Sequence, residues 1–105
     1  KTYNGRPIMF ELPKPLTKDS ILQKITEEDI FSRYLGITPD YQRSFKNPLR
    51  VDNNAGCVFY INSQGRIKFK DYGGHYDWDC FNVVEKAYGI TFKEALKKIA
   101  ADYNI

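Results

Sequence analysis

Residues 68–82, with the sequence KFKDYGGHYDWDCFN, gather side chains that could coordinate a metal or transfer a proton. His75 is the only histidine of the chain, aspartates lie on both sides of it, and Cys80 completes the set. An imidazole, a thiol and carboxylates are the groups used in many metal sites and in acid–base catalysis. The spacing and the positions of these residues test each of the two chemistries in turn.

The spacing does not favour a metal site. Cys57, His75 and Cys80 are separated by 18 and 5 positions, whereas structural zinc sites use closely spaced pairs of ligands. We therefore predict no metal, a loop position for His75 and two reduced, structural thiols.

The aspartates do not favour catalysis either. Asp77 and Asp79 stand where a helix is expected to begin, and carboxylates are common there as caps. The sequence holds no phosphate-binding loop, nucleophile elbow or metalloprotease helix, and Gly73-Gly74 is too short to cradle a phosphate. The chain is predicted not to be an enzyme by itself and to need no cofactor.

Charge points to a different role. Residues 41–70 carry a net charge of +5, although the whole chain has only +3. The basic residues of this segment are Arg43, Lys46, Arg50, Arg66, Lys68 and Lys70. A local excess of one sign is the electrostatic pattern expected for a surface that binds a polyanion.

The elements that position these cations follow from periodicity. Residues 57–62 and 66–70 alternate in polarity around the turn Ser63-Gln64-Gly65, which predicts a β-hairpin. One hairpin face would collect Cys57, Phe59, Ile61, Ile67 and Phe69, and the other Tyr60, Arg66, Lys68 and Lys70. A basic strand face beside an aromatic ring suits a single-stranded nucleic acid. Lysines on an exposed strand can also serve only to prevent edge-to-edge aggregation, and the pattern leaves both interpretations open.

Helices are expected on both sides of the hairpin. A helical lead-in covers residues 17–36, with Thr26 and Asp29 as an imperfect capping box and Gly36 at its end. Asp77 is expected to cap the next helix. The last one begins with the capping box of Thr91 and Glu94, and its apolar stripe consists of Phe92, Ala95, Leu96, Ile99 and Tyr103.

These elements give one α+β domain with a small antiparallel sheet. It spans residues 17–105, with a ribbon over 44–76 and C-terminal helices over 77–104. Residues 1–16 contain three prolines and are read as an extended arm. The chain begins at Lys1 and is read as a trimmed or excised domain. No apolar run approaches the roughly 20 residues of a membrane span, and two cysteines suit a reducing compartment, so we expect the cytoplasm.

From about residue 44 onward the chain resembles the N-terminal zinc-ribbon domain of bacterial and phage DNA primases. That family shows Cys-Pro-Phe-His, two strands, and Cys-Phe-Gly-Cys before a helix. Here Asn47-Pro48-Leu49-Arg50 corresponds to the first ligand pair and Asp71-Tyr72-Gly73-Gly74 to the second, while Phe81-Asn82 matches the helix start. The closing GITFKEALKKIA is similar to the last helix of the family.

The departure from the family lies in the ligands. All four positions are changed, to Asn47, Arg50, Asp71 and Gly74. The resemblance therefore implies a zinc-ribbon-like sheet that is metal-free, in which a pair between Arg50 and Asp71 is an attractive substitute for the metal.

The resemblance implies a replication function. Such domains help a primase to engage a single-stranded template and to select where priming starts, while catalysis resides in another domain. The resemblance therefore implies a binding module that is either excised from a longer primase or primase-helicase or is a stand-alone relative. The expected contacts are Arg66, Lys68 and Lys70 for phosphates, Tyr60 for stacking, and Arg50 or Lys46 as a flank. Expected partners are single-stranded DNA, with RNA not distinguished from it, and a primase catalytic domain or replicative helicase. The alternative is a protein-interaction module that docks on a replication partner through the arm, Tyr76 and Trp78.

Overall fold

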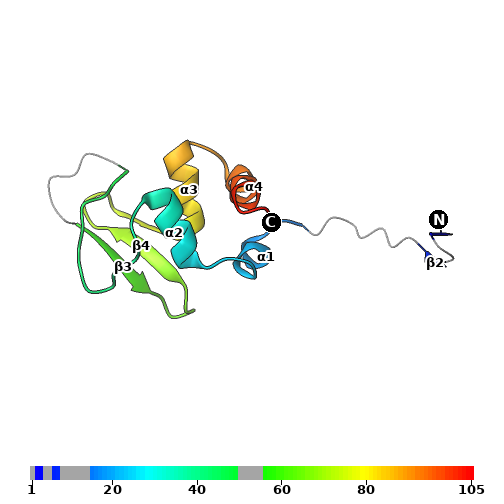
Figure 1. Cartoon of the computed structure of the whole chain (residues 1–105). Helices are drawn as coiled ribbons and strands as arrows, with labels where there is room; N and C mark the ends of the chain where they lie inside the picture. The colour runs from blue at the N-terminus through cyan, green and yellow to red at the C-terminus, as the bar shows by residue number, and fades with distance from the viewer. Residues whose placement is uncertain (1, 4–5, 8–14, 50–55) are drawn as a thin grey trace.

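The computed structural model describes residues 2–3, 6–7, 15–49 and 56–105 (Figure 1). Within the segment expected to be an extended arm, β1 (Thr2–Tyr3) pairs antiparallel with β2 (Arg6–Pro7). The remaining elements form an α+β domain, as predicted, with helices before and after a small sheet.

The sheet has three antiparallel strands in the order β3–β4–β5. They are β3 (Cys57–Ile61), β4 (Ile67–Asp71) and β5 (Tyr76–Trp78). The predicted hairpin is confirmed, and its turn is closed by Asn62, whose Oδ1 accepts the N–H groups of Gln64 at 3.0 Å and Arg66 at 2.9 Å. The third strand was not predicted.

Each of the four helices begins with a capping box, in which the side chains of the first and fourth residues bond each other's backbone N–H. They are α1 (Lys18–Leu22), α2 (Glu27–Leu35), α3 (Cys80–Tyr88) and α4 (Phe92–Asp102). The boxes at Thr26 and Thr91 are confirmed. The prediction that Asp77 caps α3 is wrong: Asp79 is the cap, because Asp77 pairs with Lys70 inside β5.

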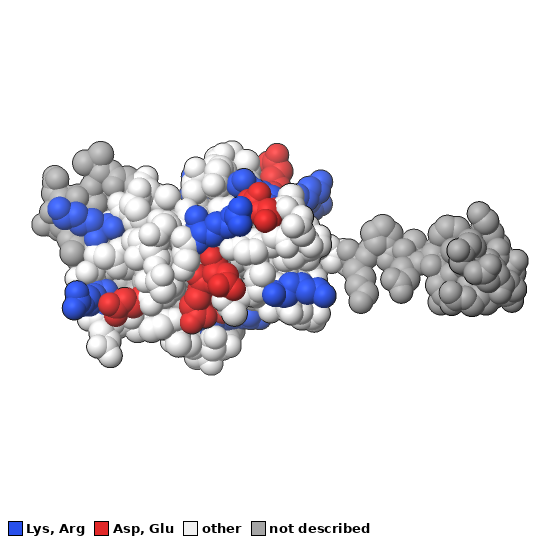
Figure 2. Space-filling model, viewed as in Figure 1, with Lys and Arg blue, Asp and Glu red and all other residues white. Residues whose placement is uncertain are grey.

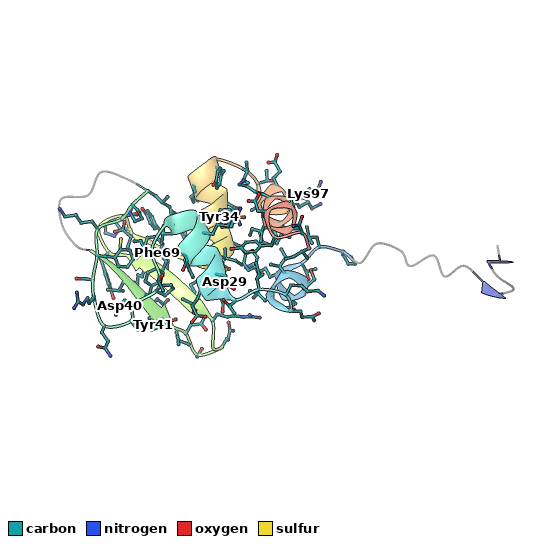
Figure 3. The ribbon with its side chains drawn as sticks, viewed as in Figure 1. Asp29, Tyr34, Asp40, Tyr41, Phe69 and Lys97 are labelled. Carbon is teal, nitrogen blue, oxygen red and sulfur yellow. The ribbon has the colours of Figure 1, made fainter. Side chains whose placement is uncertain are left out.

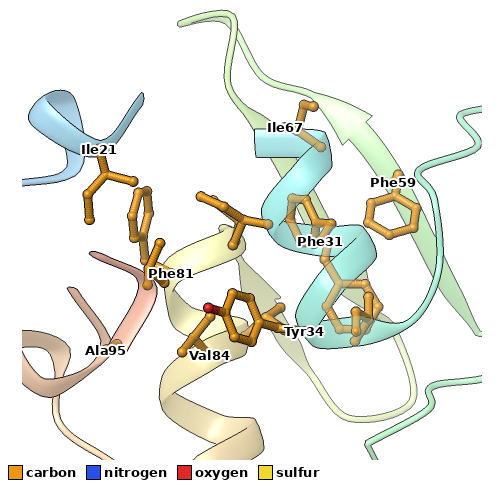
Figure 4. Packing of buried hydrophobic residues seen from close by; sticks show 14 of the residues in the cluster. Ile21, Phe31, Tyr34, Phe59, Ile67, Phe81, Val84 and Ala95 are labelled. Carbon is orange, nitrogen blue, oxygen red and sulfur yellow. The ribbon is translucent and has the colours of Figure 1, made fainter. Parts of the chain in front are cut away.

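Aromatic rings from α2, the loop before β3 and the strands β3 and β4 form part of the core between the sheet and the helices (Figure 4). Phe31 of α2 meets Phe59 edge-on at 5.1 Å between ring centroids. Phe45, from the loop before β3, stacks on Phe59 at 5.0 Å and on Phe69 at 5.6 Å. The loop is fixed there by mutual backbone hydrogen bonds between Phe45 and Cys57.

Two residues predicted to lie on apolar, core-facing positions are exposed: Ile61, and Phe92 at the start of α4, which keeps 38% of its surface accessible. Ile61 keeps 57% of its surface accessible, whereas its partner Ile67 keeps 6%. The start of α2 lies over β4, where the Glu27 carboxylate accepts a hydrogen bond from the Ile67 N–H. The helix does not cover Ile61, at the end of the edge strand β3. Burial raises the pKa of Glu27.

The last helix is held by polar contacts as well as by its apolar stripe. Tyr34 of α2 donates its hydroxyl to Asp102 at 2.6 Å, and Lys98 pairs with the same carboxylate at 3.2 Å (Tyr34 is labelled in Figure 3). The hydrogen bond from Tyr34 lowers the pKa of Asp102, while burial raises that of Tyr34. Within the described part of the chain, no helix has the length and apolar character that crossing a membrane requires.

Phe69 provides a test of this core. Its ring is fully buried and contacts Phe45, Phe59 and Trp78. We expect Phe69→Ala to lower the free energy of unfolding by about 3 to 5 kcal/mol, because it removes a large buried ring and leaves a cavity. Urea denaturation followed by circular dichroism measures this. Tyr72→Ala, at a ring that is 60% exposed, is the control and should cost far less.

Candidate nucleic-acid interface

The sheet presents one face to the helices and another away from them. Phe59, Phe69 and Trp78 lie in register on the helical side. The other side carries Val58, Tyr60, Lys68, Lys70 and Asp77, which we call the open face. Each of these five residues is half-buried or exposed. The open face thus brings together three of the predicted contact residues with an aspartate that the prediction did not include.

Asp77 lies at the centre of the contacts on the open face. Its carboxylate accepts the hydroxyl of Tyr60 and lies 3.9 Å from the ammonium of Lys68. Because the strand order is β3–β4–β5, the Tyr60 side chain reaches across the central strand to make this bond. The hydrogen bond to Asp77 raises the pKa of Tyr60 to about 12. Tyr60 is therefore an anchored ring, which the sequence did not indicate.

The other predicted cations are differently placed. Lys70 lies 4.8 Å from the Tyr72 ring and forms no ion pair within the described residues. Arg66 pairs with Asp19 of α1 at 3.2 Å, at the turn end of the hairpin. Lys46 is exposed in the loop after Phe45. Arg50 lies outside the described residues. Of the two cations of the open face, Lys68 is therefore paired with Asp77, and Lys70 has no ion pair within the described residues.

Charge on the helical side is mixed. In Figure 2, viewed from the side of α2, basic and acidic groups are interspersed. At the hairpin turn Lys68 of the open face also meets the helices: it lines a cavity of about 310 Å³ together with Lys18 and Arg66 and with the acidic residues Asp19, Glu27 and Asp79. Lys18 is paired with Asp79 at 2.6 Å and Arg66 with Asp19. This cavity offers no net positive charge to an anion.

Three of the four positions that the resemblance predicts to match zinc ligands lie together. Asn47 is 2% exposed, and its amide donates to Asp71 at 2.8 Å and to the Tyr76 hydroxyl at 2.5 Å. Asp71 is fully buried and accepts the N–H of Gly74 at 2.9 Å. We call Asn47, Asp71, Gly74 and Tyr76 the polar cluster. It joins the loop before β3 to the turn between β4 and β5.

At Gly74, the space that a larger side chain would fill is occupied by the Tyr76 ring. A Cβ atom at this position would lie 3.0 Å from Asp71 Oδ2 and 2.5 Å from the Tyr76 ring. A side chain at position 74 would therefore point into the polar cluster, where the Tyr76 ring now lies. Tyr76 is half-buried and stacks on Trp78 at 3.8 Å. The two aromatics are less exposed than expected, because both are half-buried and pack against the core.

The residues of the opening segment do not assemble into one site. His75 is exposed in the turn before β5, whereas Cys57 and Cys80 are both buried. Burial raises the pKa of the Cys80 thiol. In the part of the chain that the structure describes, no three His, Cys, Asp or Glu side chains are grouped so that they could hold a metal ion.

Comparison with protein-family models, curated proteins and solved structures finds no significant match for this chain. The relation to primase zinc ribbons consequently stays a prediction from the sequence motifs.

The polar cluster predicts that folding does not require zinc. The amide and carboxylate groups of Asn47 and Asp71 already bond one another, which removes the need for a metal bridge between the two turns. We expect a chelator to leave the melting temperature unchanged and elemental analysis to find no stoichiometric zinc. Bound zinc together with melting on chelation would contradict this.

Gly74→Ala tests the packing of the polar cluster. The added methyl would overlap the Tyr76 ring, so we expect a loss of about 1 to 3 kcal/mol in the free energy of unfolding. The matched control is Gly56→Ala, whose methyl would meet its nearest atom at 3.7 Å, an ordinary contact. Equal stability of the two variants, measured by thermal and urea denaturation, would refute the proposed crowding.

Proposed function

We propose that this chain is a binding module for single-stranded nucleic acid and that the open face is its contact surface. The observation that carries the proposal is the arrangement of Tyr60, Lys68 and Lys70 on adjacent strands of the sheet face opposite the aromatic core, where all three are half-buried. Cations and a ring at this spacing supply the two interactions that such ligands use, phosphate contacts and base stacking.

The geometry fits an extended strand. Lys68 and Lys70 alternate along β4, which spaces their Cα atoms by about 7 Å, close to the spacing of successive phosphates in an extended chain. Tyr60 lies directly opposite Lys68 on β3. Its anchored ring would stack on a base without first losing much rotational freedom.

The primase relation is part of the same proposal. Its support is the convergence of Asn47, Asp71 and Gly74, positions that match three zinc ligands in the resemblance. On this basis the module is a metal-free, zinc-ribbon-like domain of a primase or primase-helicase. It would engage template, DNA or RNA, without catalytic groups of its own. The catalytic domain would be a partner.

A protein-interaction function is the alternative. Leu16 and Leu96 line an apolar hollow of about 180 Å³ that is flanked by Lys93 and Lys97 on α4. This hollow lies outside the open face and could accept an apolar side chain of a replication partner. Strand binding that is absent at low salt would favour this function.

The decisive variants reverse the charge of the open face. Lys68→Glu combined with Lys70→Glu should abolish binding of a short oligothymidylate at low salt, because both lysines would then repel phosphates. Fluorescence anisotropy measures the affinity, and circular dichroism checks the fold. Lys70→Ala alone should reduce the slope of log affinity against log salt by about 0.7 to 0.9.

Tyr60→Ala is the matched test of stacking. It should weaken binding by about 1 to 3 kcal/mol at every salt concentration, since stacking is not screened. Reversal at a distant site, Lys93→Glu with Lys97→Glu, is the control for net charge. If the open-face double variant binds as the wild type does, the open face is not the contact surface.

A further inference from the structure

Asp77 is the only carboxylate among the residues of the open face. In the register of the sheet it lies beside Lys70, and its two oxygens contact Lys68 and Tyr60. It therefore occupies the place where a phosphate bound to Lys68 would lie. An incoming phosphate meets both a negative charge and a lysine that already has a partner.

The ion pair between Lys68 and Asp77 is long and partly exposed. Its charged atoms lie 3.9 Å apart, the two side chains are 21% and 40% exposed, and ion pairs in contact with solvent contribute little to stability. The strand pairing of β4 with β5 is provided by the backbone. Asp77 can thus release Lys68 at small cost, which is what a displaceable competitor requires.

We propose that Asp77 is a specificity-determining residue: it makes the open face select polynucleotide strands and reject single nucleotides and isolated phosphates. This inference rests on the proposed function. Asp77 competes for Lys68 from within the same sheet, so its effective concentration is in the millimolar range or above. A free phosphate must displace it unaided.

A strand overcomes this competition through its second contact. Lys70, which has no ion pair in the described structure, can take the first phosphate. The next phosphate of the same strand then reaches Lys68 at a comparably high effective concentration. Two linked phosphates can therefore displace Asp77 from Lys68, whereas a single free phosphate cannot.

The variant that tests this is Asp77→Asn, which keeps the shape of the side chain and removes its charge. We expect its affinity for oligothymidylate to rise several-fold at low salt and its salt slope to steepen by up to about 0.7 to 0.9, as one more counterion is released. Competition by thymidine monophosphate should strengthen by a larger factor than oligonucleotide binding does. Fluorescence anisotropy with labelled oligothymidylate gives all three quantities.

The matched control is Asp40→Asn. Asp40 forms an exposed pair with Arg43 at 3.8 Å in the loop before Phe45, so the change in net charge is identical (Asp40 is labelled in Figure 3). Its affinity should stay close to that of the wild type. An equal gain in both variants would show that net charge, and not Asp77, sets the affinity.

The outcomes separate the inference from the function beneath it. If the wild type binds oligothymidylate and Asp77→Asn binds no tighter, the role of Asp77 is wrong and the proposed function stands. If neither protein binds at low salt, both are wrong. A gain confined to Asp77→Asn, larger for the mononucleotide, supports both.

A readout without nucleic acid tests the contact itself. The difference between the alkaline absorbance titrations of the wild type and Tyr60→Phe isolates the Tyr60 phenol. Because its hydroxyl donates to Asp77, the phenol should ionise at a pKa of about 12 and revert toward its ordinary value in Asp77→Asn. An ordinary pKa in the wild type would show that Asp77 does not hold Tyr60, and would overturn the inference.

Discussion

Burial of the Asp71 carboxylate is the constraint on which the ribbon depends. A buried carboxylate is costly unless its oxygens receive hydrogen bonds. Here one oxygen accepts the Asn47 amide and the other accepts the Gly74 backbone. Meeting this requirement fixes the loop before β3 against the turn after β4, although the two segments lie 24 positions apart. The position of β5 follows, because the turn leads directly into it.

A metal and this polar cluster stabilise a small domain in different ways. A structural zinc ion contributes free energy through ligand bonds that need little surrounding core. Hydrogen bonds contribute only about 1 kcal/mol each in net terms, so the remainder must come from apolar packing. The stack of Phe45, Phe59 and Phe69 and the Tyr76–Trp78 pair supply that packing. The high aromatic content of the chain has its physical reason here.

Local signals made much of the fold predictable. Capping residues at Thr26 and Thr91 act within one helical turn, and the alternation in β3 and β4 reports directly on burial. The strand β5 was not predicted because three residues are too few to show a period of two. The helix cap was misassigned because Asp77 and Asp79 are equally good caps in sequence, and only strand pairing places Asp77 in the sheet. The prediction that Ile61 is buried was wrong for a related reason. Alternation predicts on which face of the sheet a residue lies, but it does not predict how far the covering helix extends.

In the candidate site, too, the charge seen along the sequence differs from the charge that remains unpaired in the structure. The segment 41–70 is strongly basic in sequence, yet Arg66 and Lys68 meet carboxylates from α1 and β5, which lie outside it. The Tyr60–Asp77 bond crosses a strand and could not be foreseen without β5. After this pairing the open face retains a modest positive charge, centred on Lys70. Under the proposed function, few phosphate contacts would give weak affinity, and the face would become effective when a tether to another domain raises the local concentration of the strand. A module with these proposed properties, weak alone and selective for linked phosphates, would release its strand easily once a tethered domain has bound it.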